Sequence, residues 1–156
     1  MSRLYSFKTI QKIPADLNTV WDFISSPGNL RLITPPSLGF EVLSETAEKM
    51  FPGQIIAYKV SPLPGLRINW VTEITHVKEK EYFVDEQRSG PYSIWHHMHF
   101  LKPLADGVEM NDEVYYKIPF SVLGDAANYL LVRKRIRQIF DYRFRVLEEM
   151  FGKYGS

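Results

Sequence analysis

Between residues 40 and 118 the sequence forms a series of short strand-like segments separated by short turn signals, a pattern that restricts the possible folds more than any other feature. Gly or Pro occurs in most of the breaks, and Asp106-Gly107 forms the tightest of them. Strands joined by such short connections pair with their neighbours in opposite directions, so the pattern predicts an antiparallel meander. The predicted strands cover residues 40–47, 54–60, 66–77, 81–88, 94–103 and 108–118.

The segments that flank the meander predict one further strand and three helices. Residues 3–12 alternate and predict a first strand, and residues 17–24 carry apolar residues at helical spacing. Residues 29–33 predict a short second helix that ends before two consecutive prolines. Residues 125–151 predict a long C-terminal helix with one broad apolar face. We therefore expect an α+β fold in one domain, 1–156, with the long helix laid on one face of the sheet.

Charge and cysteine content exclude several classes of function. The chain has 19 Lys and Arg, 18 Asp and Glu and a net charge of +1, which argues against nucleic acid as the main partner. It has no cysteine, which excludes disulfides, thiol catalysis and thiolate metal sites. There is no glycine-rich phosphate loop. The sequence has neither a signal-like apolar segment nor an apolar run of membrane-spanning length, so we expect a cytoplasmic protein. We also expect a monomer or a homodimer.

The predicted strand at 94–103 carries three of the four histidines. Trp95, His97 and His99 fall on one face of it, and buried imidazoles need either partners or a wet cavity. The His-x-His spacing also suits a metal, with Asp85 or Asp112 as a third ligand. Because interior histidines are more often satisfied by hydrogen bonds, we favour a hydrogen-bonded wall and expect no metal or other cofactor.

Charged residues on neighbouring elements predict partners for these histidines. Asp85 shares a face with Phe83 and Gln87, and Asp112 lies on the apolar face of the last strand. Arg143 falls in the middle of the apolar face of the long helix. We expect a buried polar network in which Arg143 pairs with one carboxylate and the histidines bond the other. The network either clamps helix to sheet or orients a ligand, and the sequence does not distinguish the two.

The order of elements, with several local motifs, resembles the helix-grip fold of the START-like superfamily. That superfamily includes birch-pollen-allergen-type proteins, lipid-transfer START domains and polyketide cyclases. The motifs resemble those of the small bacterial SRPBCC-type proteins called polyketide cyclase/dehydrase-like. They are Ile13-Pro14-Ala15, Val20-Trp21-Asp22-Phe23, Phe83-x-Asp85-x-Gln87, Gly90-Pro91-Tyr92, Trp95-x-His97-x-His99, Met110-x-Asp112-x-Val114-x-Tyr116 and Phe140-x-Tyr142-Arg143. The resemblance implies a sheet wrapped around the long helix, with two short helices after the first strand and a cavity for an apolar ligand.

The expected function is therefore binding of a small hydrophobic or aromatic molecule, lipid-like or polyketide-like, in an internal cavity. One alternative is a cyclase or dehydratase using a His–Asp acid–base pair, with His97, His99, Asp85 and Asp112 as candidates. Another is a non-catalytic accessory or interaction module. The expected ligand-binding residues are Trp70, Phe83, Asp85, Gln87, Trp95, His97, His99, Asp112, Tyr116, Phe140 and Arg143.

Overall fold

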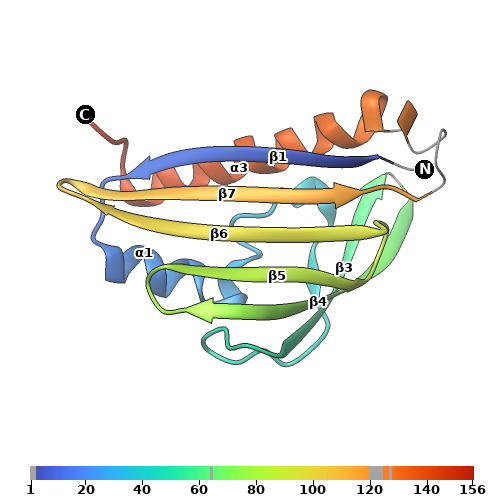
Figure 1. The fold of residues 1–156 in the computed structure, drawn as a ribbon, viewed down its shortest axis with the longest axis horizontal. Coiled ribbons are helices and arrows are strands. Elements are labelled where there is room, and N and C mark those ends of the chain that lie inside the picture. The colour runs from blue at the N-terminus through green and yellow to red at the C-terminus, as the bar shows by residue number, and fades with distance from the viewer. Residues whose placement is uncertain (1–2, 64, 120–124, 127) are drawn as a thin grey trace.

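In the computed structural model, which describes residues 3–63, 65–119, 125–126 and 128–156, a seven-stranded antiparallel sheet dominates the fold (Figure 1). Its order is β1-β7-β6-β5-β4-β3-β2, so the meander runs across the sheet in sequence order and β1 closes it by pairing with β7. The strands are β1 (Leu4–Ile13), β2 (Glu41–Val42), β3 (Gln54–Leu63), β4 (Leu66–Lys78), β5 (Tyr82–Ser89), β6 (Ile94–Leu104) and β7 (Gly107–Lys117). The antiparallel meander is confirmed.

Helices lie on one side of this sheet. The long helix α3 (Arg133–Phe151) runs along β1, and α1 (Leu17–Ile24) lies near the end of β6 and β7 where the C-terminus also lies (Figure 1). Helix α1 begins after Asp16, whose carboxylate accepts a hydrogen bond from the Thr19 amide at 3.0 Å. None of the helices in the described part of the chain is long and apolar enough to cross a membrane.

Three predicted elements differ from those observed. The second helix is a 3-10 turn, η1 (Pro27–Asn29), and successive turns follow it to a further 3-10 turn, η2 (Pro36–Leu38), because prolines interrupt helical hydrogen bonding. The strand predicted at 40–47 shortens to β2, since the amides of Leu43 and Ser44 both turn to the Ala57 carbonyl. The long helix predicted at 125–151 is not one continuous α-helix. Residues 125–126 are helical and residue 127 lies outside the described residues, whereas a π-helical segment, η3 (Asn128–Val132), precedes the start of α3 at Arg133.

The core has two apolar clusters with a polar layer between them. One cluster includes Met110 of β7 with residues of α1, β5 and β6, and the other contains Val114 of β7. Alternate residues of β7 face the interior, so Asp112 lies on this buried face between Met110 and Val114 and is only 1% exposed. A carboxylate in this position requires hydrogen-bond partners.

Candidate functional site

Four polar residues on three adjacent strands converge in the interior. The strand register sets Asp85 of β5 opposite His97 of β6, and His99 of β6 opposite Asp112 of β7. His97 and His99 are two residues apart and share the inner face of β6, where they are 4% and 7% exposed. The structure thus brings together the four residues that the sequence analysis named as catalytic candidates.

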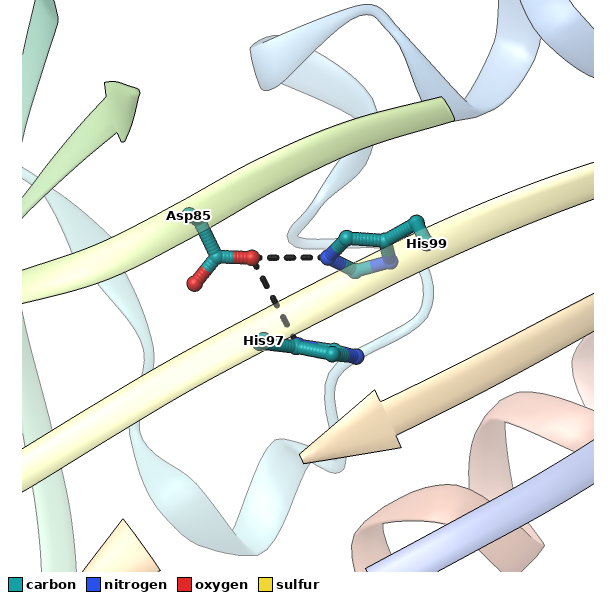
Figure 2. A group of neighbouring side chains, drawn as sticks. All are labelled: Asp85, His97 and His99. Atoms are coloured by element: carbon teal, nitrogen blue, oxygen red, sulfur yellow. Dashed lines mark hydrogen bonds and ion pairs between the residues drawn. The ribbon is translucent and has the colours of Figure 1, made fainter. Parts of the chain in front are cut away.

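Each histidine contacts both carboxylates. His99 lies with Nε2 2.7 Å from Asp85 Oδ2 and with Nδ1 2.9 Å from Asp112 Oδ1. His97 lies with Nε2 2.9 Å from Asp112 Oδ1 and with Nδ1 3.5 Å from Asp85 Oδ2. Figure 2 shows a single oxygen of Asp85 directed at both rings. The three short contacts each need an N–H donor, so one of the two rings must carry two protons.

Burial and the neighbouring carboxylates shift the pKa values of the two histidines in opposite directions. Burial lowers the pKa of His99, but hydrogen bonds to Asp112 and Asp85 outweigh burial and raise it above its ordinary value. Burial and repulsion from His99 hold the pKa of His97 below its ordinary value. Burial would raise the pKa of Asp112, but hydrogen bonds from both histidines hold it well below its usual range. Both nitrogens of His99 make short contacts with carboxylate oxygens, whereas only Nε2 of His97 does, so the geometry assigns two protons to His99 and an Nε2–H donor to His97.

Arg143 of α3 completes the cluster from the helix side. Its Nη1 lies 3.5 Å from Asp112 Oδ1, its guanidinium lies 5.0 Å from the centre of the Phe140 ring, and the residue is 8% exposed. Its Nε is buried without a hydrogen-bond partner among the described residues. Two carboxylates, Arg143 and a protonated His99 give the cluster no net charge, which limits the cost of burying it.

Aromatic rings fix the orientation of the two imidazoles. Phe83 stacks on His99 with 4.0 Å between ring centres, and the two histidine rings lie 3.6 Å apart. Trp95 and Phe140 meet His97 edge to face at 6.3 and 5.6 Å. Because these contacts restrict ring rotation, the imidazoles are held in place independently of any ligand.

A cavity of about 150 Å³ lies beside this cluster, between the sheet, the long helix and the segment after α1. Seven of the eleven predicted ligand-binding residues line it, namely Trp70, Phe83, Asp85, Trp95, His97, His99 and Arg143. Most of the remaining wall is apolar. The indole Nε1 of Trp70 is buried without a hydrogen-bond partner among the described residues, so the cavity wall includes one donor that nothing there satisfies.

The other four predicted residues lie outside the cavity wall. Asp112 lies behind the histidines, where it accepts from both of them. Tyr116 and Phe140 belong to the second apolar cluster. Gln87 bonds the backbone of Tyr92, donating to its carbonyl at 2.6 Å and accepting from its amide at 3.2 Å. A Cβ on Gly90 would lie 2.5 Å from Gln87 Oε1, so glycine there leaves room for this contact.

Several wall residues were not selected from the sequence. Ile56 of β3 and Thr72 and Ile74 of β4 line the cavity, and all three are almost completely buried. They lie at every second position from Tyr58 on β3 or Trp70 on β4, on the same inner face, so period-two spacing was a usable signal for them. Leu30 and Ile33 also line the cavity, from turns after α1, and no periodic pattern marks them.

Comparisons with known proteins identify the fold. No protein-family model matches the sequence, and no curated protein matches it. Protein CV1439 from Chromobacterium violaceum is similar in structure with a TM-score of 0.71, at 15% identity over 95% of this chain and 98% of that one. The major latex-like protein 151 from Panax ginseng gives a TM-score of 0.68, at 12% identity over 95% and 97%.

The structure named Ara h 8.0201 gives a TM-score of 0.65, at 12% identity over 96% of this chain and 98% of that one. At such low identity these similarities concern the fold, and they extend over nearly the whole chain. The element order, the sheet that curves along the long helix and these neighbours together show that the chain has the START-like helix-grip fold.

Proposed function

We propose that this protein binds a small, largely apolar molecule containing about one ring in its interior cavity. The observation that carries the proposal is the cavity of about 150 Å³, which has mainly apolar walls and a polar cluster on one side. An apolar cavity of about this volume is large enough for a benzene-sized molecule. Binding there would come mainly from removing apolar surface from water.

Polar groups in the wall support a ligand that also carries one acceptor, such as a carbonyl. Within the described part of the chain, the Trp70 indole N–H and the Arg143 Nε–H have no hydrogen-bond partner, and Arg143 Nη1 lies 3.5 Å from Asp112 Oδ1. A ligand oxygen that accepts from either group would satisfy a donor whose burial is otherwise costly. The apolar part of such a ligand would contact the opposite wall, which includes Ile33 and Ile56.

Calorimetric titration with acetophenone and ethylbenzene tests this proposal, because the two compounds share a ring and differ mainly in the carbonyl. We expect both to bind at one site and acetophenone to bind more tightly. Ile56→Phe should abolish binding by filling the cavity, since Ile56 is 2% exposed and lines it. Ile55→Phe is the matched control, because Ile55 is the next residue of β3 and is 49% exposed.

Two results would contradict the proposal: no binding of either compound by the wild type, or equal losses in the two variants. Absence of binding would favour the accessory-module alternative, in which the cavity has no ligand.

The cyclase or dehydratase alternative is supported by one observation. His97 lines the cavity, has Nδ1 3.5 Å from Asp85 Oδ2, and has a pKa held below its ordinary value by burial, so it could accept a proton from a bound carbonyl compound. If the protein catalyses such a reaction, dehydration of a small β-hydroxy ketone should disappear in His97→Gln while binding of acetophenone persists. Turnover that is unchanged in His97→Gln would exclude this role.

A further inference from the structure

Three atoms of the types that bind transition metals converge at the cavity wall. Asp85 Oδ2 lies 2.7 Å from His99 Nε2 and 3.5 Å from His97 Nδ1 (Figure 2). One donor atom from each of the three residues lies within 4.8 Å of the other two. We propose that Asp85, His97 and His99 bind a divalent first-row transition metal ion, of the class of Zn²⁺, Fe²⁺ or Co²⁺.

The position of Asp112 is the second observation for this site. Its Oδ1 lies 2.9 Å from the far nitrogens of both rings, Nε2 of His97 and Nδ1 of His99. With these two nitrogens as donors, His97 Nδ1 has a lone pair on the side of Asp85, and His99 Nε2 has one there once a metal ion replaces its proton. Metal-binding histidines usually donate their second N–H to a carboxylate in this way, which fixes the tautomer and the ring orientation.

Two of the three separations between the ligand atoms are close to those of a metal site. Metal–ligand bonds of about 2.0–2.1 Å place neighbouring ligand atoms roughly 2.8–3.0 Å apart in octahedral geometry and roughly 3.3–3.4 Å apart in tetrahedral geometry. The ligand atoms of the two histidines lie within 4.8 Å of each other. The separation of 3.5 Å between His97 Nδ1 and Asp85 Oδ2 is close to the tetrahedral value, and the 2.7 Å separation between His99 Nε2 and Asp85 Oδ2 must widen by about 0.1–0.7 Å. Asp85 can provide this movement, because its side chain is 16% exposed, whereas stacking holds the histidine rings.

The three proposed ligands face the cavity, so a bound metal ion would be accessible to a molecule in the cavity. Asp85, His97 and His99 line the cavity, whereas Asp112 lies behind them. Three protein ligands leave at least one coordination position, and here it faces the cavity. Two nitrogens and one carboxylate favour Zn²⁺, Fe²⁺ or Co²⁺ over Mg²⁺ and Ca²⁺, which prefer oxygen ligands.

Charge does not prevent the metal from binding. Asp85, Asp112 and Arg143 together leave one negative charge, which a proton on His99 balances when no metal is present. A divalent ion would replace that proton and leave one positive charge, which a hydroxide or an anionic ligand in the open position would neutralise. Arg143 contacts Asp112 at 3.5 Å and is thus placed on the carboxylate behind the ligands.

The sequence alone favours a hydrogen-bonded wall without a metal at these histidines. Two contacts that the sequence does not predict favour the metal: one oxygen of Asp85 faces both histidines, and Asp112 lies behind both rings. The metal site is also distinct from the acid–base alternative, because a metal on His97 Nδ1 would block the nitrogen that accepts the proton.

Titration of the chelator-treated protein with Co²⁺ tests the site, with visible absorption and calorimetry as readouts. We expect one Co²⁺ per chain with d–d bands typical of nitrogen and oxygen ligands, and a higher melting temperature when Co²⁺ is present. Asp85→Asn and His99→Ala should each weaken binding at least 100-fold. Asp112→Asn should weaken it by about 10–100-fold, because it retains the ligands and disturbs only their support.

His96→Ala is the matched control. His96 precedes His97 on β6 and also pairs with a carboxylate, Glu86 at 2.7 Å, but on the other face of the sheet. Binding in this variant should equal that of the wild type. The proposal is overturned if wild-type protein takes up no stoichiometric Co²⁺, or if His96→Ala loses as much binding as His99→Ala. The wild-type result decides even if a variant fails to fold, and circular dichroism identifies such a variant.

Discussion

Replacing Asp112 by Asn tests whether the buried polar cluster holds the helix and the sheet together. Asp112 is 1% exposed, and one of its oxygens contacts His97 and His99 at 2.9 Å and Arg143 at 3.5 Å. Asn has the same shape, but it removes the negative charge and places an amide among groups that also donate hydrogen bonds. His99 and Arg143 would then be buried cations with Asp85 as the remaining carboxylate.

The expected cost follows from breaking a buried ion pair by removing one partner, which is about 3–5 kcal/mol. For a chain of 156 residues this corresponds to a fall in melting temperature of roughly 6–20 °C. Urea unfolding monitored by tryptophan fluorescence and by circular dichroism measures the free energy, and agreement between the two probes shows that unfolding is two-state.

Glu113→Gln provides the matched control on the next residue of β7. Glu113 pairs with Lys8 at 2.8 Å at the surface, where the Lys8 side chain is 55% exposed. Exposed pairs contribute little, so this variant should unfold at nearly the wild-type urea concentration. The reasoning is refuted if Asp112→Asn is as stable as Glu113→Gln, because the cluster would then not stabilise the fold.

Three further predictions concern other parts of the same interior. Leu147→Ala should cost about 2–5 kcal/mol in urea unfolding, since Leu147 is 0% exposed, and it should enlarge the cavity enough to bind naphthalene measurably in a calorimeter. Gly107→Ala should lower the melting temperature strongly, because a Cβ there would meet the Ile13 carbonyl oxygen at 2.1 Å, whereas Gly28→Ala, with nothing within 4 Å, should not. In an acid titration, the free energy of unfolding should fall as the pH drops from about 5 to 2. In this range Asp112 binds a proton in the unfolded chain but stays ionised in the folded protein, where its pKa is lowered, so acid favours the unfolded state. The fall should be shallower in Asp112→Asn, and equal slopes would contradict this assignment.

The sequence predicts much of this interior because side chains alternate along a strand. Period two places His97 and His99 on one face of β6, and the 3.6-residue period places Arg143 on the inner face of α3. These positions need only local geometry. The pairing of nitrogens with oxygens could not be predicted, because it depends on the register that sets Asp85 opposite His97 and His99 opposite Asp112.

Inward orientation also does not determine whether a residue meets a cavity or packed core. Tyr116 and Phe140 face inward, yet they pack in the second apolar cluster rather than at the cavity. Gln87 lies on the strand face of Phe83 and Asp85, but it folds over Gly90 to bond Tyr92. Only the tertiary arrangement of helix and sheet decides these outcomes.

Methyl NMR of isoleucine-labelled protein titrated with acetophenone tests ligand binding in the cavity most directly. Ile56, Ile74 and Ile139 line the cavity, whereas Ile10 and Ile55 are 57% and 49% exposed. We predict saturable shifts of the methyl signals of Ile56, Ile74 and Ile139 with a single dissociation constant, while the signals of Ile10 and Ile55 do not shift. Shifts confined to exposed methyl groups, or no saturable shift at all, would contradict a ligand-binding interior.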